Sequence, residues 1–441
     1  MKILNRDELL RTGNSEIRAK MLDIVETAVN AVDPYTCIKN AVKVDGSTMS
    51  VSGELYDLQS FKRIFVVGAG KASARMAMAL HNLLGERITG GFVNALESGK
   101  VGSIVLNKTT HPHPGTEGLQ GALRIKEICE SAGERDLVIC VISGGGSAMM
   151  PCPVRGVTLE DKKKTAELLM LAGASIEELN TVRRHLSQLK GGNLARIAYP
   201  ATVLSLIISD VIGDPLESIA SGPTAPDPTT FADALHVLER YGVFEQVPAS
   251  VKEKLAAGER ENPKPGDPIF EKVKNVIVAS NTIALEAALA KSRDHGFESL
   301  ILTSSMRGEA RNVGTALARL GNQIRQSLDS SQMKMIIAGG ETTVTVKGRG
   351  RGGRNCELVL SALFELEDGI TLLSLGTDGI DGNTDAAGAI ADASMFREEA
   401  SRFLANNDSY SYFLKYGGLI FTGATGTNVC DIVLLAVSRK A

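Results

Sequence analysis

Hydrophobic runs of strand length alternate with segments of helical spacing along much of the chain. The clearest runs are residues 61–67, 137–142, 203–208, 276–279 and 299–303. Segments whose apolar residues recur at helical spacing follow the first, fourth and fifth runs, the last of them over about residues 308–328. Strands that alternate with helices build βαβ units around a mainly parallel sheet. Ligands of such folds bind beyond the carboxyl ends of the strands, so the loops there are the first candidates for a site.

The pattern of hydrophobic, polar and glycine residues changes in the second half of the chain. Residues 258–268 (GERENPKPGDP) are rich in proline and charge, a composition typical of a linker or an excursion. Farther on, residues 342–346 alternate Thr and Val, as a strand with one buried face does. We therefore predict an N-terminal α/β domain over residues 1–260, a linker and connecting α/β segment over 261–333, and a smaller α/β domain over 334–441.

Composition narrows the class of protein. Hydrophobic residues make up 43% of the chain, charged residues make up 22%, and the formal net charge is −3. This slightly acidic balance argues against nucleic acid, whose partners usually carry a basic excess. No stretch approaches the roughly 20 apolar residues that span a bilayer, and the polar N-terminus does not resemble a secretory signal. The six cysteines lack CxxC spacing, so we expect a cytoplasmic protein with reduced thiols.

The 45 glycines change this picture most, because they fall in clusters. The clusters read GAG, SGGGS, KGG, GGE, GRGRGG, GTDGIDG and TGATGT. Clustered glycines let the backbone approach a ligand closely or adopt a positive φ. Several such loops in one chain indicate a site that holds phosphates.

The first cluster lies where a strand is expected to end and a helix to begin. Gly68 and Gly70 turn the chain, and Lys71 stands at the start of the helical segment. Free N–H groups and the helix dipole favour an anion there, and a lysine adds a cation suited to a phosphate in transfer. The spacing is not that of a Walker A loop, and Ser73 stands where the dinucleotide fingerprint has its third glycine. The alternative is a tight turn with a lysine in solvent.

The second cluster directly follows the hydrophobic run at 137–142. Its residues are Ser143, Gly144, Gly145, Gly146 and Ser147. Three glycines flanked by hydroxyl groups can form a nest of N–H groups around an oxyanion. The alternative is a flexible turn, but the position after a buried strand favours the anion site.

Several carboxylates also follow strands. Asp210 comes just after the run at 203–208, and Asp378 follows LLSL in GTDGIDGNTD, with Asp381 and Asp385 nearby. Mg²⁺ is usually held by one or two carboxylates together with waters and substrate phosphates. Some of these residues must instead cap loops or form Asx turns. We rank Asp210 and Asp378 first as tentative metal ligands.

A basic, glycine-rich stretch occupies residues 347–355 (KGRGRGGRN). Its cations repel one another unless an anion is near, and arginine suits two-pronged contact with phosphate or carboxylate. The alternative is a solvated hairpin loop. Arg349, Arg351, Arg354 and Asn355 are the candidates here.

Three further candidates are weaker. Lys190 precedes Gly191 and Gly192 in a segment that looks like a helix end with a glycine cap. Thr425 and Asn428 lie in TGATGTN, which either lines a nucleotide or substrate or only caps the next helix. We include these three residues among the candidate substrate- and phosphate-binding positions.

The loops in this order resemble those of the class II glycerate 2-kinases, the family whose C-terminal module is called MOFRL. The matching stretches are VVGAGKASARMA, THPHPG, VISGGGSAMM, SDVIGDPLESIASGPTAPDPTT, AGGETTVTVKGRGRGGRNCELVL, LSLGTDGIDGNTDAAGA and TGATGTNVCDIVL. They extend from about residue 60 to the end of the chain. The resemblance implies two lobes, a Rossmann-like N-terminal domain with a doubly wound parallel sheet and a distinct, smaller α/β MOFRL domain.

The resemblance also implies an activity, the ATP-dependent phosphorylation of D-glycerate at its 2-hydroxyl with Mg²⁺, giving 2-phosphoglycerate and ADP. Carried over by motif, Lys71 and Arg354 would be the catalytic cations. Family members are expected to have Asn-Asp after TGTNV, and Cys430 stands here in place of that Asn, which weakens any polar role for the position. Neither Lys71 with the SGGGS loop nor the Arg-Gly loop alone would neutralise both a triphosphate and a carboxylate, so we expect a site in a cleft between the lobes.

Two other functions remain open from the residues alone. An NAD(P)-dependent hydroxypyruvate or glycerate dehydrogenase would need a complete dinucleotide fingerprint and a general acid, usually His, and the six His residues show no obvious relay with a carboxylate. A non-catalytic nucleotide sensor would not need Lys71, Arg354 and several strand-end carboxylates together. The sequence leaves open which lobe holds ATP and whether the chain forms a homodimer.

Overall fold

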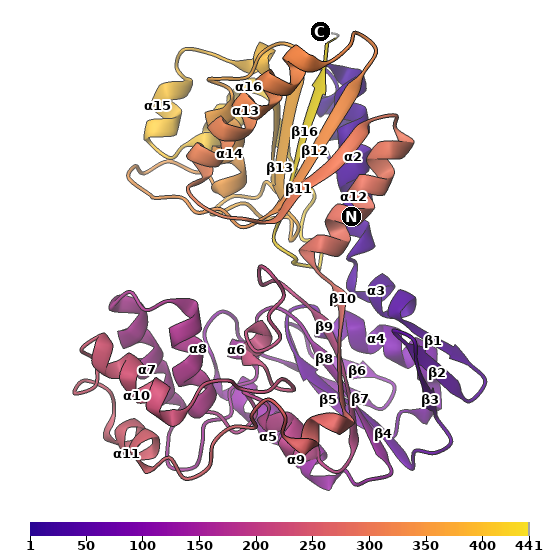
Figure 1. Cartoon of the computed structure of the whole chain (residues 1–441), viewed down its shortest axis with the longest axis vertical. Coiled ribbons are helices and arrows are strands. Elements are labelled where there is room, and N and C mark those ends of the chain that lie inside the picture. The colour runs from indigo at the N-terminus through magenta and orange to yellow at the C-terminus, as the bar shows by residue number, and fades with distance from the viewer. Residues whose placement is uncertain (440–441) are drawn as a thin grey trace. The chain divides into compact units, whose positions relative to one another are not determined.

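The computed structural model describes residues 1–439, which form two compact units (Figure 1). We call residues 34–278 the inserted unit, and residues 1–33 together with 279–441 the flanking unit. This division differs from the predicted boundaries, because the first 33 residues belong with the C-terminal part of the chain. Their helix α2 (Ser15–Ala31) packs on α12 (Asn281–Asp294) and on the sheet of the flanking unit.

A seven-stranded sheet, mainly parallel as predicted, forms the centre of the inserted unit. Its order is β10-β9-β8-β4-β5-β7-β6. The strands are β4 (Arg63–Ala69), β5 (Gly90–Ala95), β6 (Gly99–Val101), β7 (Ile104–Lys108), β8 (Asp136–Ile142), β9 (Thr202–Ile208) and β10 (Val273–Ala279). Strands β9, β8, β4, β5 and β7 pair in parallel in this order, and β6 pairs with β7 in the antiparallel sense.

Helices cover both faces of this sheet, so the fold is doubly wound. On one face Phe65, Val67 and Ala69 of β4 join a buried cluster with α5 (Thr116–Ser131) and α9 (Asn193–Ala198). Helix α4 (Ser73–Leu84), which starts directly after β4, contacts β4, β5 and β8 without joining that cluster. The central strands are buried on both faces, which explains why they read as unbroken apolar runs.

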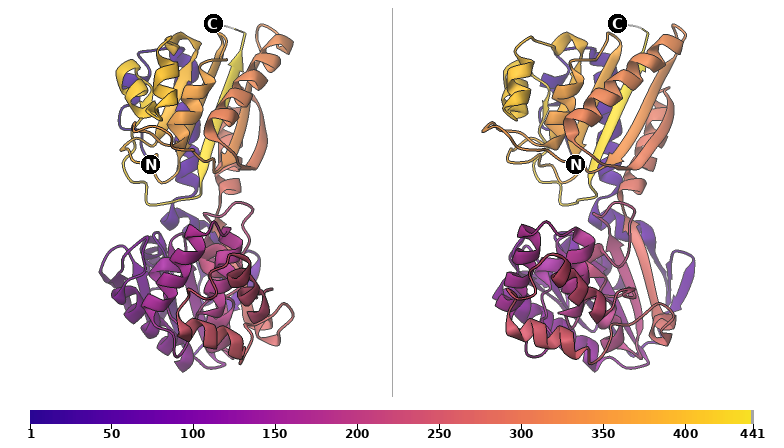
Figure 2. Two further views of the ribbon diagram at one scale, coloured as in Figure 1. Left: turned by 90° about the vertical axis from the view of Figure 1, so that its left-hand side faces the viewer. Right: turned by 60° about the vertical axis from the view of Figure 1, so that its left-hand side comes forward.

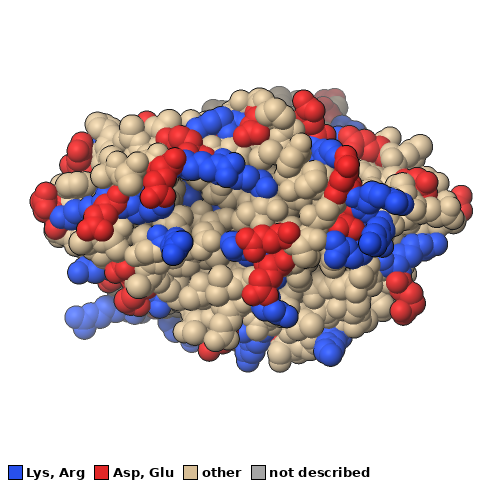
Figure 3. All heavy atoms as spheres, turned by 90° about the horizontal axis from the view of Figure 1, so that it is seen from below, with Lys and Arg blue, Asp and Glu red and all other residues tan. Residues whose placement is uncertain are grey.

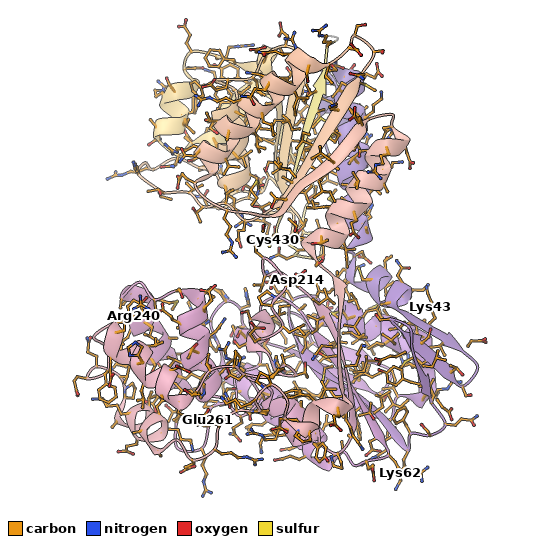
Figure 4. All side chains as sticks on the ribbon, viewed as in Figure 1. Lys43, Lys62, Asp214, Arg240, Glu261 and Cys430 are labelled. Atoms are coloured by element: carbon orange, nitrogen blue, oxygen red, sulfur yellow. The ribbon has the colours of Figure 1, made fainter. Side chains whose placement is uncertain are left out.

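Four helices form a second cluster in the inserted unit: α7 (Leu159–Leu171), α8 (Ile176–His185), α10 (Phe231–Arg240) and α11 (Ala249–Ala257). Three of them begin with a capping box, at Thr158, Ser175 and Thr230, each with an acidic residue three positions on. Reciprocal side-chain and backbone hydrogen bonds satisfy the free N–H groups at these ends. A salt bridge between two of these helices joins Arg240, which is labelled in Figure 4, to Glu178 at 2.7 Å.

Residues 258–268 are part of this unit and are not a linker between domains. Asn262 is buried and donates to Asp227 at 2.8 Å, while Asn193 donates to Asn262 at 2.7 Å. Glu261, labelled in Figure 4, accepts a hydrogen bond from the backbone of Phe231. These bonds fix the segment against the helices, despite its proline- and charge-rich composition.

The remaining elements of the inserted unit are short. They are α3 (Pro34–Ala41), the antiparallel strands β1 (Val42–Asp45), β2 (Thr48–Val51) and β3 (Glu54–Asp57), and α6 (Gly146–Met149). On the face drawn in Figure 3, Lys and Arg side chains are interspersed with Asp and Glu.

The flanking unit is a six-stranded mixed sheet with helices on both faces (Figure 2). The strands are β11 (Glu298–Met306), β12 (Met333–Gly340), β13 (Ile370–Gly376), β14 (Gly388–Asp392), β15 (Leu419–Ile420) and β16 (Asp431–Ser438), in the order β11-β12-β16-β13-β14-β15. Only β11 and β12 pair in parallel among these strands. Helices α13 (Ala310–Ser327) and α14 (Arg354–Ala362) pack together on one face, and α2 and α12 pack together on the other.

The Thr/Val run at residues 342–346 is not a strand. Strand β12 ends at Gly340, and after it a single bridge joins Thr343 to Glu309. The side chain of Glu309 accepts hydrogen bonds from the backbone and hydroxyl of Thr345 and so holds the run as an extended loop. The smaller helices of this unit are α1 (Arg6–Leu9), α15 (Ala400–Ala405) and α16 (Ser409–Tyr416). Within residues 1–439 we find no helix that is both long and apolar enough to cross a membrane.

A buried ion pair ties the N-terminal helix to the rest of the flanking unit. Arg18 of α2 is fully buried, and its guanidinium donates to Asp392 at 2.7 and 3.1 Å. The same guanidinium also donates to the carbonyl of Leu9 and the hydroxyl of Thr12. Removing one partner of such a pair leaves an uncompensated charge in the interior.

We predict that Asp392→Ala destabilises the flanking unit by about 3 kcal/mol or more, because Arg18 would stay buried without its carboxylate. Urea unfolding together with hydrogen exchange of the α2 amides measures this loss. The matched control is Glu16→Gln, which breaks the exposed Lys20–Glu16 pair on the same helix and should lower the unfolding free energy by less than about 1 kcal/mol. Equal losses in the two variants would contradict the prediction.

Candidate functional site

The order of strands in the inserted unit places a switch point between β4 and β8. From β4 the chain first adds β5 and β7 on one side, and β8 and β9 then extend the sheet on the other side. In open α/β sheets, ligands bind in the crevice at the carboxyl ends of the two strands that flank such a point. The two loops that follow β4 and β8 are the GAGK turn and the SGGGS loop predicted from the sequence.

The glycines of the GAGK turn are required by the closeness of β4 and β8. A Cβ on Gly68 would overlap the backbone of Val141, and a Cβ on Gly70 would overlap Ser143. Both glycines also have φ near +150°, a conformation that L side chains rarely adopt. Ser73, in place of the third glycine of the dinucleotide fingerprint, donates its hydroxyl to the carbonyl of Val141 at 3.0 Å.

The SGGGS loop is ordered by contacts with the turn beside it. The Ser143 hydroxyl accepts from the backbone N–H of Ala72 at 3.0 Å, and the carbonyl of Gly144 accepts from the N–H of Lys71 at 3.0 Å. The Ser147 hydroxyl lies 2.5 Å from that of Ser221, a residue with φ +60°. Sequence reasoning did not single out Ser221, and the adjacent strained residue Ala220 (φ +50°) also packs here.

Asp210 lies against this loop. A Cβ on Gly144 would overlap its carboxylate, so the glycine is what allows the two to pack together. The loop that follows, which contains Asp214 with φ +55° (Figure 4), lies beyond the end of β9. The predicted strand-end position of Asp210 beside a glycine-rich loop is therefore present in the structure.

Lys71 and His111 lie at the open side of the SGGGS loop. A Cβ on Gly145 would come within 2.8 Å of the His111 ring and 3.3 Å of Lys71 Cγ. Burial lowers the pKa of His111, and the charges of Lys71 and His113 lower it further. The Lys71 side chain is therefore close enough to this loop to act on an anion that it holds.

A pocket of about 700 Å³ opens beside the loop, within the inserted unit. Gly145 and Ser147 line it together with the turn at His111 and residues of α7 and α8. Lys190, another candidate from the sequence, also lines it and is 1% exposed. The glycines after Lys190 do not end a helix as predicted, since Gly192 precedes the first turn of α9 in a left-handed conformation.

In the flanking unit, Arg354 is the first residue of α14 and is held by carboxylates. Its guanidinium donates to Asp431 at 2.6 and 3.0 Å and to Glu341 at 2.6 Å. Burial lowers the pKa of Arg354, but the hydrogen bonds and charge of Asp431 outweigh it and raise the pKa above its usual value. Burial also raises the pKa of Asp431 to about 6, against the lowering effect of Arg354.

Asn355 and Asp381 have structural contacts at the start of α14. Asp381 is buried and accepts from the backbone N–H groups of Asn355 and Cys356 at 2.9 and 2.8 Å. The Asn355 side chain donates to Asp381 and accepts from the Ser374 hydroxyl at 2.6 Å. The structure thus places Asn355, predicted as a binding residue, in the interior with its donors and acceptor engaged.

The Arg-Gly loop at 347–353 is anchored rather than mobile. Its backbone N–H groups donate to side chains of Asn406, Asn407 and Asp408, which follow α15. Its glycines allow this closeness, since a Cβ on Gly348 or Gly350 would overlap the Asn406–Asp408 backbone. These three anchors lie outside every motif identified in the sequence.

The two other arginines of this loop differ in their surroundings. The Arg351 guanidinium lies over the Tyr410 ring at 4.5 Å, while Arg349 is exposed and its backbone N–H donates to Asn406. Both arginines are exposed, so each is accessible to an anion, although the Tyr410 ring lies against one face of the Arg351 guanidinium.

The remaining candidates lie together at the ends of β13 and β16. Asp378 accepts from the N–H of Ile380 in an Asx turn, and its carbonyl accepts from the N–H of Thr425. The Thr425 hydroxyl donates to the carbonyl of Thr377 at 2.6 Å, and Asn428 accepts from the N–H of Cys430. Within residues 1–439 no group of three or more His, Cys, Asp or Glu has the geometry of a metal site.

Comparison with known proteins assigns the family. The domain of unknown function DUF4147 matches residues 20–256, and the MOFRL family matches residues 334–431. The glycerate 2-kinase of Pyrococcus horikoshii is 40% identical over 438 residues, covering 96% of this chain and 98% of that protein. The chain belongs to the class II glycerate kinase family.

Other members agree with this assignment in sequence and in fold. The D-glycerate 2-kinase of Thermotoga maritima is 38% identical over 425 residues, covering 94% of this chain and 96% of that protein. A crystal structure of the Thermotoga maritima glycerate kinase, at 36% identity, has a TM-score of 0.86 and covers 96% of this chain and 99% of that one. A Pyrococcus horikoshii structure at 38% identity has the same TM-score. The Rossmann-like and MOFRL parts expected from the resemblance are thus confirmed.

For this glycerate kinase family member, we predict that turnover falls as the pH drops through about 6, because protonation of Asp431 releases the carboxylate that orients Arg354. The raised pKa means that the carboxylate is ionised above that pH and lost below it. Asp431→Asn should lower kcat about tenfold at neutral pH. Its pH–rate profile should also lack the fall below about pH 6, which we call the acidic limb. Steady-state rates from about pH 5 to 8 measure both effects.

The control is Glu365→Gln, an exposed carboxylate of the same unit that pairs with Arg319 at 2.7 Å. It should keep the wild-type kcat and acidic limb. An unchanged acidic limb in Asp431→Asn would contradict the assignment of that limb to Asp431.

Proposed function

We propose that the protein is a glycerate 2-kinase that transfers the γ-phosphoryl group of ATP to the 2-hydroxyl of D-glycerate and releases 2-phosphoglycerate and ADP. The observation that carries the proposal is the position of Lys71 between two glycine-rich turns, at the switch point of a doubly wound sheet. That is where such folds bind phosphates. The names of the relatives supply the acceptor, since those from Pyrococcus horikoshii and Thermotoga maritima are glycerate 2-kinases.

Phosphoryl transfer leaves the protein little covalent chemistry, so its contribution is positioning and charge. Lys71 would stabilise the charge that develops on the transferred group, and the N–H groups of Gly144 and Gly145 would bind phosphate oxygens. Arg349 and Arg351 are further candidates for phosphate or substrate contact. Thr425 and Asn428, at the ends of β13 and β16, stay candidates for lining the nucleotide or the substrate.

The contacts of Arg354 would allow a ligand to replace one of its two carboxylate partners. Its buried partner Asp431 fixes the guanidinium plane through two hydrogen bonds, while its other partner, Glu341, is 46% exposed. An exposed ion pair contributes little net stability. A phosphate or carboxylate could therefore replace Glu341 at the outer nitrogen without disturbing the contact with Asp431.

We further propose that a Mg²⁺ ion takes part, with Asp210 or Asp378 among its ligands. Asp210 and Asp378 each offer a hard carboxylate oxygen beside a glycine-containing turn, and Mg²⁺ commonly binds one or two carboxylates together with substrate phosphates. When bound, the ion would neutralise phosphate charge. It stays a prediction that the residues of both parts of the chain act on one triphosphate in a cleft between them. Which part holds the nucleotide is open, and the cytoplasmic location and a homodimer also stay predictions.

A dehydrogenase is the alternative, and one relative carries a provisional name of that kind. The hydroxypyruvate reductase so named in Agrobacterium vitis is 42% identical over 383 residues. The first turn argues against dinucleotide chemistry, because Ser73 replaces the third glycine and its hydroxyl bonds to Val141 of β8. The kinase names of the other relatives favour phosphoryl transfer.

The deciding experiment incubates the full chain with D-glycerate and Mg-ATP and measures ADP. Coupling to enolase without phosphoglycerate mutase distinguishes the 2-phosphate, which enolase consumes directly, from the 3-phosphate. With Mg²⁺ we expect ADP and an enolase signal in equal amounts. Because enolase itself needs Mg²⁺, the metal requirement is measured by ADP alone, which should be lost in EDTA and recovered in excess Mg²⁺. NAD(P)H consumption with hydroxypyruvate and no ADP would favour the dehydrogenase, and full activity in EDTA would remove the metal from the mechanism.

We predict that Lys71→Ala lowers kcat by about a hundredfold or more, the size of one lost contact to transition-state charge. Its thermal stability should stay close to wild type, because the backbone of Lys71, and not its side chain, makes the bond to Gly144. Lys100→Ala, an exposed lysine on β6 of the same unit, is the control for loss of surface charge. A folded Lys71→Ala enzyme with near-normal kcat would exclude this role.

A further inference from the structure

A buried ammonium group in the inserted unit lacks a partner. The Lys190 side chain is 1% exposed, and its Nζ has no hydrogen-bond partner among the residues that the structure describes. The same residue lines the pocket of about 700 Å³ beside the SGGGS loop. Lys190 therefore reaches that pocket from the protein interior.

An unpaired charge in such a position is unfavourable, because burial removes water from the ammonium group without supplying an anion. Burial lowers the pKa of Lys190 well below its usual value, and the charges of Lys162 and Arg183 lower it further. The remaining titratable neighbour is Cys152, whose own pKa burial raises. Among the described residues, no carboxylate is one of the groups that shift the pKa of Lys190.

The neighbouring cations make an anion more favourable still. Lys162 of α7 lies in the same pocket wall, is buried, and donates to the carbonyl of Leu186 at 3.2 Å. Burial lowers its pKa to about 7. The two carboxylates among the pocket-lining residues, Glu160 and Glu167, are both exposed. The interior side of the pocket thus carries basic groups that an anion would stabilise in their charged form, and the acidic groups of the lining face solvent.

We propose that this pocket is the acceptor subsite and that Lys190, supported by Lys162 and Arg183, binds the carboxylate of the hydroxy acid. The inference rests on the proposed kinase function and names where its acceptor binds. A carboxylate is a compact single charge that can reach a buried ammonium and form a charge-assisted hydrogen bond. A triphosphate carries several charges and needs a metal and many donors, which the glycine-rich loops and strand-end carboxylates provide better.

The position of the pocket agrees with this role. Gly145, Ser147 and His111 belong to its lining, and Lys71 lies beside Gly145 and His111. If the carboxylate of the hydroxy acid binds Lys190, its hydroxyl groups would point toward the SGGGS loop and Lys71. The pocket would then present the 2-hydroxyl to the phosphoryl group that Lys71 stabilises.

The test compares Lys190→Met with Lys164→Met, an exposed lysine of α7 that is not part of the pocket lining. In Lys190→Met we expect the KM for D-glycerate to rise roughly ten- to a hundredfold, the range of one lost charge-assisted contact. The KM for ATP should not change, and Lys164→Met should match wild type. D-glyceramide, whose amide replaces the carboxylate, should be a poor substrate of wild type and lose nothing further in Lys190→Met.

The possible failures can be told apart. A wild-type enzyme that makes no ADP from D-glycerate overturns both the proposed function and the subsite. An active wild type with an unchanged glycerate KM in Lys190→Met overturns the subsite alone. A raised KM for ATP with an unchanged KM for glycerate also overturns it and assigns the pocket to the nucleotide.

A second measurement on the wild-type chain covers the case in which Lys190→Met does not fold. Binding of a carboxylate should raise the pKa of the buried lysines, so glycerate binding should take up protons. Calorimetry in two buffers of different ionisation enthalpy detects this uptake, at about pH 8.5, where the lowered pKa of His111 keeps that ring neutral. We expect uptake with D-glycerate and none with D-glyceramide. Glycerate binding without proton uptake would overturn the subsite.

Discussion

The closeness of β4 and β8 is the constraint on which the candidate site depends. Gly68 and Gly70 let the turn after β4 lie directly on Val141 and Ser143, and no side chain fits at either glycine. This contact brings Lys71 beside the SGGGS loop, and the loop in turn lies against Asp210 through Gly144. A lysine, a set of N–H groups and a carboxylate are thereby collected at one edge of a sheet whose topology already favours a ligand there.

The basic residues of the two candidate sites have different surroundings in the two units. In the inserted unit Lys190 has no hydrogen-bond partner among the described residues, and Lys162 donates only to a carbonyl. In the flanking unit Arg354 donates to Asp431 and Glu341. If the proposed function holds, the first arrangement would favour binding of an anion and the second would fix the position of Arg354, and phosphoryl transfer needs both.

Structural features that depend on neighbouring residues in the sequence could be predicted from it, whereas features that depend on contacts between distant segments could not. The apolar runs, the turn at Lys71 and the position of Asp210 follow from hydrophobicity and glycine. The anchoring of the Arg-Gly loop by Asn406–Asp408 and the interior place of Asn355 depend on contacts between segments far apart in the chain. The same holds for residues 1–33, whose place beside the C-terminal strands no local signal indicates. Cys430 is a different case, because the resemblance leads us to expect Asn at this position. The backbone of Cys430 is left-handed (φ +69°), a conformation that Asn adopts more readily than most residues.

The insertion of one unit within the other has a consequence for synthesis on the ribosome. Helix α2 is synthesised before the inserted unit. The helix α12 and the strands that cover the apolar face of α2 are synthesised only after the whole inserted unit. At roughly 5–20 residues per second this delay lasts tens of seconds. During that time Met21, Leu22 and Val25, all buried in the finished protein, are open to solvent or to chaperones, while the inserted unit already has its complete chain. Connectivity thus sets the order of synthesis, and the chain that carries the GAGK turn and the SGGGS loop is complete before the part that carries Arg354.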